Sequence, residues 1–339
     1  MHSPLQFFCS PLYPSPLLAR IGLQLSAKTG RYLALLVCLL VGLLPPATAE
    51  VALAPRLVII DTGIDSSMPL FSNHLVHEVC IMDWYTCPNG TNFQEGPGTA
   101  TVPSSIINFN GFDHGTQMAA IAMNENPNLE FIFIRIHGNN RNGARLNVSE
   151  NTVMNALDWA KLNAKKYNIK AVSMSQGHHN LKSSGKYCPS TPTFEKKILD
   201  LKYLDIPVFF PTGNAGDKSR IDFPACIVSA VAVGALNEKD QITSYSNMDR
   251  TLTDFYVLGD IATVGPAGAY RFATGTSVST QIAAAKWIAM VSAYPTKSYS
   301  EIYSAFRSSG SIVFDKSYKY GRKMEFDKAK ALFEPSPTG

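Results

Sequence analysis

Short apolar runs recur along the chain, and turn-forming or charged residues bound each of them. Short runs of mostly apolar residues are typical of strands buried on both faces of a parallel sheet. Five such runs are predicted as strands: 56–61 (RLVIID), 131–136 (FIFIRI), 171–175 (AVSMS), 206–213 (IPVFFPTG) and 227–235 (IVSAVAVGA).

Helical periodicity occupies stretches between these runs. It is clearest after Ser149, where Val153, Ala156, Leu157 and Ala160 fall on one stripe behind a capping serine. Strands that alternate with helices predict an α/β fold, with a doubly wound, mostly parallel sheet flanked by helices on both faces.

The chain beyond the N-terminal segment is predicted to be a single domain, because no repeat or linker-like stretch divides residues 50–339. The exception to its regularity is 72–112, which is rich in Asn, Gly, Pro and Thr. We interpret this segment as a loop-rich insertion. Irregular segments of this length are usually functional or mobile.

Residues 1–49 differ from the rest of the chain. They contain three cations and no acid, and the mostly apolar run YLALLVCLLVGLL is shorter than the roughly 20 residues that cross a bilayer. The residues PP and ATA that follow are typical of a signal-peptidase site. We therefore predict a signal peptide with a long n-region, cleavage near Ala49, export to the periplasm or the extracellular space, and no stable membrane span.

Three other interpretations of this leader stay open. The start codon could be mis-assigned upstream of a shorter signal, or the leader could be an uncleaved anchor. An organellar transit peptide is less favoured, because arginine is sparse in residues 1–49.

Charge and cysteine content exclude some partners and ligands. The formal net charge is +4, and removal of the three leader cations brings the mature chain close to neutral, with no basic stripe that would suggest nucleic-acid binding. The four cysteines outside the leader favour disulfides over a metal site in an exported protein, and no Cys or His spacing indicates zinc. Cys80 with Cys87 and Cys188 with Cys226 is one of three possible pairings.

Four polar residues stand at ends of the predicted elements, where an α/β sheet places its ligands. Asp61 ends the first strand, His114 begins a helix of small residues, Asn214 follows another strand, and Ser277 begins a helix. A serine hydroxyl becomes a nucleophile when an imidazole accepts its proton and a carboxylate fixes the tautomer of that imidazole. An amide and the N–H groups of a helix N-terminus can then stabilise an oxyanion.

The motifs around these residues resemble the subtilisin-like serine peptidases, the subtilases. The resemblance rests on DTGID at 61–65, HGT at 114–116, GNAG at 213–216 and GTSVS at 275–279, in that order. AVSMSQG at 171–177, the stretch 222–247 and the closing segment 320–332 are also similar to that family. The match covers roughly residues 56–332.

The resemblance implies a role for each of these residues in an exported serine endopeptidase that works through an acyl-enzyme. Asp61 would orient His114, His114 would act as general base and then acid, Ser277 would attack the carbonyl, and Asn214 would supply an oxyanion donor. The segments that would bind substrate include Ser175, Gln176, Gly177, Thr212 and Gly213. No cofactor is required; calcium often stabilises these enzymes, but no acidic cluster is specific enough to name ligands.

The sequence departs from the family pattern at several positions. Gln281 replaces a proline, Gln117 replaces a second histidine, and Asp113 stands where glycine is common. Asp113 either raises the basicity of His114 or, as we favour, is a solvated loop carboxylate. No room for a prodomain lies between Ala49 and Asp61, so the protein folds unaided, uses a separate folding helper or is restrained by an inhibitor.

Two functions are compatible with these departures. The first is a peptidase that acts on protein or peptide substrates, and the intact set of four polar residues favours it. The second is a catalytically silent peptide-binding protein on the same scaffold. For either function we hypothesise that the insertion at 72–112 partly covers the cleft and narrows the choice of substrate.

Overall fold

A computed structural model describes residues 53–108, 111–140, 142–183, 187–316 and 318–334, with no side-chain detail for residues 179, 180 and 318. The chain from Leu53 onward forms one compact unit. The predicted signal peptide at 1–49 lies outside the described residues. Within the described ranges, no helix is both long and apolar enough to cross a membrane.

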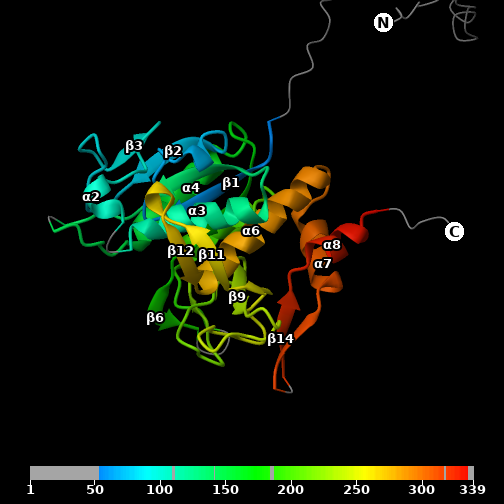
Figure 1. Ribbon diagram of the computed structural model, residues 1–339. Helices are drawn as coiled ribbons and strands as arrows, with labels where there is room; N and C mark the ends of the chain where they lie inside the picture. Colours follow the sequence, from blue (N-terminus) through cyan, green and yellow to red (C-terminus); the bar gives the residue numbers. More distant parts are fainter. Residues whose placement is uncertain (1–52, 109–110, 141, 184–186, 317, 335–339) are drawn as a thin grey trace, which may run out of the picture. The chain divides into compact units, whose positions relative to one another are not determined.

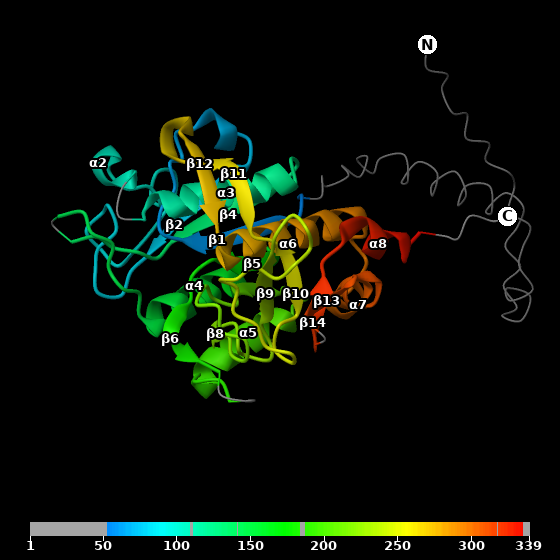
Figure 2. The same ribbon diagram turned by 60° about the horizontal axis from the view of Figure 1, so that its bottom comes forward.

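A ten-stranded sheet runs through this unit in the order β13-β14-β10-β9-β7-β5-β1-β4-β2-β3 (Figures 1 and 2). Its neighbouring strands are parallel except for the β13–β14 and β2–β3 pairs at the two edges. The strands are β1 (Arg56–Asp61), β2 (Leu75–Ile81), β3 (Phe93–Glu95), β4 (Glu130–Arg135), β5 (Ile169–Met174), β7 (Val208–Pro211), β9 (Val231–Leu236), β10 (Phe255–Leu258), β13 (Ile312–Asp315) and β14 (Tyr318–Lys323).

Helices cover both faces of the sheet. Strand β1 shows why, because its alternate residues join different cores: Leu57 packs with α3 and α6, whereas Val58 packs with α4 and α5. Figure 1 shows α3 and α6 side by side across one face. The helices are α2 (Ser104–Ile107), α3 (Asp113–Glu125), α4 (Glu150–Leu162), α5 (Pro192–Lys202), α6 (Thr276–Ala293), α7 (Tyr299–Ser309) and α8 (Phe326–Ala331), with 3₁₀ turns η2 (Pro69–Phe71) and η3 (Pro266–Gly268). The predicted doubly wound, mostly parallel fold is confirmed.

Two small antiparallel pairs lie outside the main sheet. Strands β11 (Asp260–Val264) and β12 (Tyr270–Thr274) form a hairpin directly before α6. Strand β6 (His178–Lys182) pairs with β8 (Asp222–Phe223) beyond the end of β5. Both pairs therefore lie next to elements that carry the predicted site residues.

The observed bounds differ from the predicted ones by one or two residues at β4, β5 and β7 and by more at β9, and the segment 72–112 holds more regular structure than predicted. The run predicted as a strand from 227 becomes strand only at Val231, because a turn that exposes Val228 precedes it. The segment 72–112 contains β2, β3 and α2 in addition to loops. Strand β2 escaped the pattern because it carries Glu78, a buried carboxylate that accepts the N–H groups of Gly98 at 2.7 Å and Ala100 at 3.1 Å.

The structure selects one of the three cysteine pairings. Cys80 is bonded to Cys87, with 5.8 Å between their Cα atoms, and Cys188 is bonded to Cys226, with 5.4 Å. The first disulfide closes a short loop between β2 and β3, and the second links the segment after β6 to the turn after β8.

Candidate active site

The first half of the site is an acid–imidazole pair at the end of β1. Asp61 is fully buried, and its Oδ1 accepts hydrogen bonds from the Thr62 N–H at 2.7 Å and from His114 Nδ1 at 2.8 Å. Because a carboxylate oxygen only accepts, Nδ1 carries the proton and Nε2 keeps a free lone pair. His114 remains 27% exposed, so this Nε2 belongs to an imidazole that solvent or substrate can reach.

Two hydrogen bonds of the Thr62 hydroxyl, which we call the Thr62 staple, hold the start of α3 at the end of β1. Thr62 Oγ1 donates to the Phe112 carbonyl at 3.0 Å and accepts the Gly115 N–H at 3.1 Å, which fixes the first turn of the helix. A Cβ at Gly115 would overlap the Gly63 backbone and the Phe133 ring. Glycine at 115 therefore permits the close approach that places His114 against Asp61.

Electrostatics keep the Asp61 carboxylate ionised. Burial raises the pKa of Asp61, but the charge of His114, its hydrogen bond and the Thr62 N–H outweigh burial and hold this pKa below its usual value. An ionised acid next to the ring stabilises the positive charge that His114 acquires when it takes a proton.

The second half of the site is the start of α6. The helix is capped at Gly275, whose φ of 143° favours glycine, so Ser277 lies inside the first turn and is not the N-cap. Its Oγ donates to the Ser175 carbonyl at 3.0 Å. Within the described residues, no hydrogen bond joins Ser277 to His114.

The segment after β5 connects the two halves. Gln176 Nε2 lies 3.4 Å from Asp61 Oδ1 and 3.3 Å from His114 Nδ1, while its neighbour Ser175 is bonded to Ser277. Because Nδ1 already carries a proton, the Gln176 amide can donate only to the carboxylate. The acid, the imidazole and the hydroxyl therefore converge on the two-residue segment 175–176.

Two hydrogen-bond donors near the Ser277 hydroxyl have no partner among the described residues. Asn214 is exposed, and its Oδ1 accepts from the Thr276 N–H and from Thr276 Oγ1, each at 2.9 Å, which turns Nδ2 away from these contacts. Neither Asn214 Nδ2 nor the Ser277 N–H has a hydrogen-bond partner in the part of the chain that the structure describes. An amide and a helix N-terminal N–H are the donor types that stabilise an oxyanion.

Asn247 organises the loop that carries Asn214, a role that the sequence analysis did not predict. Its Oδ1 accepts the N–H groups of Ala215 at 3.1 Å and Asp217 at 2.9 Å, and its Nδ2 donates to Asp222 at 2.9 Å. The signal for it was weak: Asn247 ends the Tyr-Ser-Asn stretch within the segment similar to subtilases.

The predicted substrate contacts differ in their exposure. Gly177 is exposed and Gln176 is half-buried, whereas only 3% of Ser175 is exposed. Thr212 is fully buried, and its hydroxyl donates to the Asn247 carbonyl at 2.8 Å. The Thr212 side chain therefore supports the loop, and contact of this residue with substrate stays a prediction for its backbone. Gly213 donates its N–H to Thr276 Oγ1 at 3.2 Å and accepts from the Asn247 N–H at 2.8 Å.

A cavity of about 490 Å³ opens beside Gln176 and Gly177. Apolar side chains of α4, β5, α5 and β8 line it together with polar ones from the loop before α4. Its lining includes Val153, Met174, Phe194, Phe223, His137 and Arg145. The cavity can therefore take a side chain that has both apolar and polar parts, from a chain that runs along residues 175–177.

His137 is a polar group in this wall that no sequence motif indicated. It is 6% exposed, its Nδ1 lies 3.0 Å from the Leu146 carbonyl, and its Nε2 has no hydrogen-bond partner among the described residues. Burial lowers the pKa of His137 to about 4, so its ring is neutral at physiological pH.

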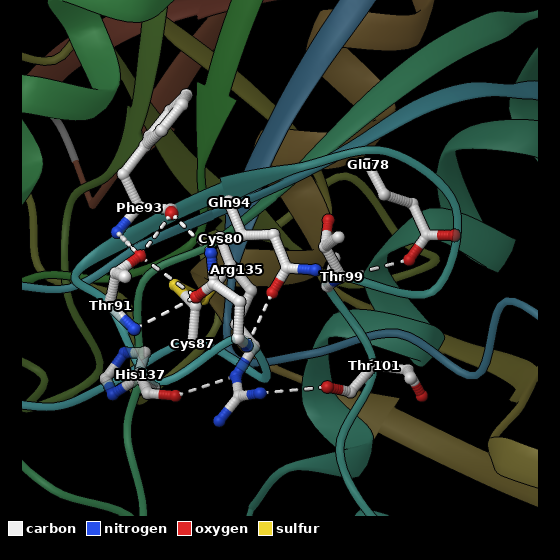
Figure 3. Close-up of a disulfide and its surroundings, with 12 residues drawn as sticks. Glu78, Cys80, Cys87, Thr91, Phe93, Gln94, Thr99, Thr101, Arg135 and His137 are labelled. Carbon is white, nitrogen blue, oxygen red and sulfur yellow. Dashed lines mark hydrogen bonds between the residues drawn. A yellow bond between two sulfur atoms is a disulfide. The ribbon is translucent and has the colours of Figure 1, made fainter.

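The segment 72–112 supports this wall from behind. A Cβ at Gly138 would overlap the Tyr85 ring, and Ser149, the N-cap of α4, donates to Asp83 Oδ2 at 2.8 Å. Figure 3 shows Arg135 beside the Cys80–Cys87 disulfide, where its guanidinium donates to the carbonyls of His137 and Thr101. No described residue of 72–112 lines the cavity itself.

Asp113 lies in an ordered helix and not in a solvated loop. It is the first residue of α3 and accepts from Gln117 Nε2 at 3.0 Å. It also pairs with Arg271 of β12 at 3.4 Å, and thereby joins the helix that carries His114 to the hairpin that leads to Ser277. Within the described ranges, no group of three or more His, Cys, Asp or Glu side chains is placed to hold a metal ion.

Comparisons with known proteins agree with this geometry. A family model described as the subtilase family matches residues 55–317. Subtilisin DY from Bacillus licheniformis is 24% identical over 258 residues, which are 72% of this chain and 87% of that protein. Subtilisin E from Bacillus subtilis (strain 168) is 24% identical over 79% of this chain, and the match spans 63% of its length.

Solved structures share the fold. The epidermin leader peptide processing serine protease from Staphylococcus aureus has a TM-score of 0.65 at 15% identity, with coverage of 85% of this chain and 77% of that one. The prenylagaramide maturation protease PagA has a TM-score of 0.61 at 17% identity, with coverage of 83% and 94%.

Proposed function

Because the chain belongs to the subtilase family and is a serine endopeptidase, we propose that Asp61, His114 and Ser277 are its catalytic triad and that Asn214 supplies an oxyanion donor. The observation that carries this proposal is the 2.8 Å hydrogen bond between His114 Nδ1 and the fully buried Asp61 carboxylate. This bond prepares an imidazole with a free Nε2 at the same segment to which Ser277 is bonded.

The first chemical step is acylation of Ser277. Its hydroxyl leaves the Ser175 carbonyl by rotation about χ1, and its proton passes to His114 Nε2 while Oγ bonds to the substrate carbonyl carbon. Negative charge on the carbonyl oxygen is stabilised by Asn214 Nδ2 and the Ser277 N–H. The C–N bond then breaks as His114 returns the proton to the leaving amine.

Deacylation repeats the same transfers with water. His114 Nε2 accepts a proton from the attacking water, and the ester bond to Ser277 breaks as the proton returns to Oγ. Each role in both steps is filled by a side chain or a backbone N–H, so we propose no cofactor for the reaction.

The substrate is proposed to be a peptide in extended conformation. Gly177 is exposed next to a strand end, which leaves backbone there for an added strand, and the cavity beside it is lined by apolar and polar side chains in similar measure. We propose that the cavity takes a substrate side chain near the scissile bond. The 72–112 segment would narrow this choice by fixing the wall through Tyr85 and Asp83.

Export is proposed from two features together. The leader at 1–49 has the order of a signal peptide, and both cysteine pairs outside it form disulfides, which persist in oxidising compartments. N-terminal sequencing of the secreted protein tests the cleavage near Ala49.

A catalytically silent peptide-binding protein is the second candidate. The observation that favours it is the Ser277 hydroxyl, which is bonded to Ser175 and not to His114. Labelling with a fluorophosphonate separates the two functions. We expect the wild type and a Ser308→Ala control on α7 to be labelled and Ser277→Ala to be unlabelled; an unlabelled wild type that still binds peptides would favour the second candidate.

A further inference from the structure

A buried chain of hydrogen bonds crosses from β5 to α6, two elements that lie side by side (Figure 2). Ser173 Oγ donates to Gln281 Oε1 at 2.9 Å, and Gln281 Nε2 donates to Ser175 Oγ at 2.8 Å. Ser175 Oγ in turn donates to the Ser277 carbonyl at 3.0 Å. Each hydroxyl proton in the chain therefore has one defined acceptor.

The position of Gln281 is unusual for an amide. The side chain is fully buried in α6 between small and apolar residues such as Ala284 and Ala285, where an apolar residue would pack without the cost of desolvating polar atoms. Both ends of the amide are hydrogen-bonded, so its orientation is fixed. Subtilases usually have proline at this position, and proline could make neither of these side-chain bonds.

The amide determines the direction of the last hydrogen bond. Because Gln281 Nε2 donates to Ser175 Oγ, the Ser175 hydroxyl must use its own proton elsewhere, and the Ser277 carbonyl accepts it. The Ser175 carbonyl accepts from Ser277 Oγ in return. Two reciprocal hydrogen bonds therefore join Ser175 to Ser277. Gln281 orients the Ser175 hydroxyl, which donates one of these bonds.

We propose that Gln281 is a positioning residue for the nucleophile. Through Ser175 it sets the backbone of Ser277, and with it the Ser277 N–H, relative to the segment 175–177 along which a peptide would run. This inference rests on the proposed role of Ser277 as the nucleophile. A hydrogen-bonded amide thus takes the position where proline is usual in the family.

The main test replaces the amide with an apolar side chain of similar size. We expect Gln281→Leu to lower kcat and the rate of fluorophosphonate labelling by about 10- to 100-fold, with KM changed less than about twofold, because small displacements of a nucleophile cost rate more than binding. Ser279→Ala is the matched control. Ser279 is also fully buried on α6 but donates to the carbonyls of Val257 and Leu258, away from Ser277.

The control separates positioning from stability. Both variants lose a buried hydrogen-bonding group, so both should melt earlier than the wild type, yet only Gln281→Leu should react slowly at a temperature where both are folded. An unchanged labelling rate in folded Gln281→Leu overturns the inference. So does an equal loss of rate in Ser279→Ala.

A second comparison tests the route through Ser175, and its single variants at Ser175 test it even where Gln281→Leu fails to fold. Ser175→Ala should reduce kcat by a similar factor, and Ser175→Thr, which keeps the hydroxyl, should restore most of it. Adding Gln281→Leu to Ser175→Ala should cause no further loss, whereas additive losses contradict the route. A wild type that neither hydrolyses peptides nor takes the label refutes the proposed function itself, which is a different result.

Discussion

The two halves of the candidate site are held in different ways. In the first half, Asp61 and His114 already form the hydrogen bond that the chemistry requires, and the Thr62 staple and Gly115 fix their elements together. In the second half, the Ser277 hydroxyl is bonded to a backbone carbonyl, while the donors beside it have no partner among the described residues. The proposed base is therefore already oriented, whereas the proposed nucleophile has to leave a hydrogen-bond partner before it can react.

The largest expected effect comes from removing the base. We expect His114→Ala to lower kcat by about 10⁶-fold, the magnitude known for loss of the base or nucleophile in subtilisin, because Ser277 then has no acceptor for its proton. The measurement is hydrolysis of a peptide substrate under saturation. His74→Gln, whose histidine lies 2.8 Å from the Leu129 carbonyl and away from the site, is the control and should stay near the wild-type rate.

The second effect tests the Asp61–His114 hydrogen bond in the first half of the site. We expect Asp61→Asn to reduce kcat by about 10⁴-fold, because a neutral amide permits the imidazole tautomer that carries its proton on Nε2. Fold and peptide affinity should change little. A loss of less than tenfold in kcat would contradict a dominant role for the Asp61–His114 bond.

The third effect tests the proposed oxyanion donor in the second half of the site. We expect Asn214→Ala to lower kcat by about 10²- to 10³-fold with KM nearly unchanged, because the oxyanion exists only after attack. Asn237→Ala, in a turn where the Asn237 side chain bonds to Lys239 and Gln241, is the control. Equal losses in kcat for the two variants would remove Asn214 from the oxyanion site.

Sensitivity of the fold to acid should originate in His137 of the cavity wall and in Asp61 of the first half. The pKa of His137 is lowered from 6.5 to about 4 by burial, so the unfolded chain takes up a proton before the folded one as the pH falls. The free energy of unfolding should therefore decrease from about pH 6.5 down to about pH 4, with a slope of up to about 1.4 kcal/mol per pH unit from this residue. The lowered pKa of Asp61 extends the loss of stability to more acidic pH.

Urea unfolding at a series of pH values tests this assignment. We expect His137→Gln to flatten the decrease between pH 6.5 and 4, and His74→Gln to leave it in place. An unchanged slope in His137→Gln would show that another group binds the proton.

The smallest effect tests the link between the halves. The Asp113–Arg271 pair is partly exposed, and such pairs contribute about 1 kcal/mol or less. We expect Arg271→Met to change kcat by less than about fivefold, and the change to diminish further when Asp113→Asn is already present. A larger, independent loss would mean that Arg271 acts directly on the substrate.

The sequence predicted most of the buried strands and the positions of the four polar residues, because each of these residues stands where a predicted strand ends or a predicted helix begins. Asp61 ends β1, Asn214 follows β7, and Ser277 begins α6, so topology alone brings them to one edge of the sheet. The family resemblance then gave them roles.

Other features depend on contacts that no local pattern encodes. Strand β2 was not predicted because Glu78 interrupts its apolar pattern. In the structure this carboxylate is buried and accepts hydrogen bonds from the N–H groups of Gly98 and Ala100. Thr212 was predicted to bind substrate from the family resemblance of its segment, which does not reveal that its hydroxyl bonds to Asn247 from a different part of the chain. Gln281 was visible only as a departure from a proline, and its partners Ser173 and Ser175 lie more than one hundred positions away.

Both disulfides lie near the wall of the cavity and not among the hydrogen bonds of the candidate site. Cys80–Cys87 lies in the segment that backs the cavity wall, and Cys188–Cys226 lies close to Phe223 and Pro224 in its lining. The hydrogen bonds of the acid, base and nucleophile described above involve no sulfur. We therefore expect a reductant to change KM for a peptide substrate more than kcat.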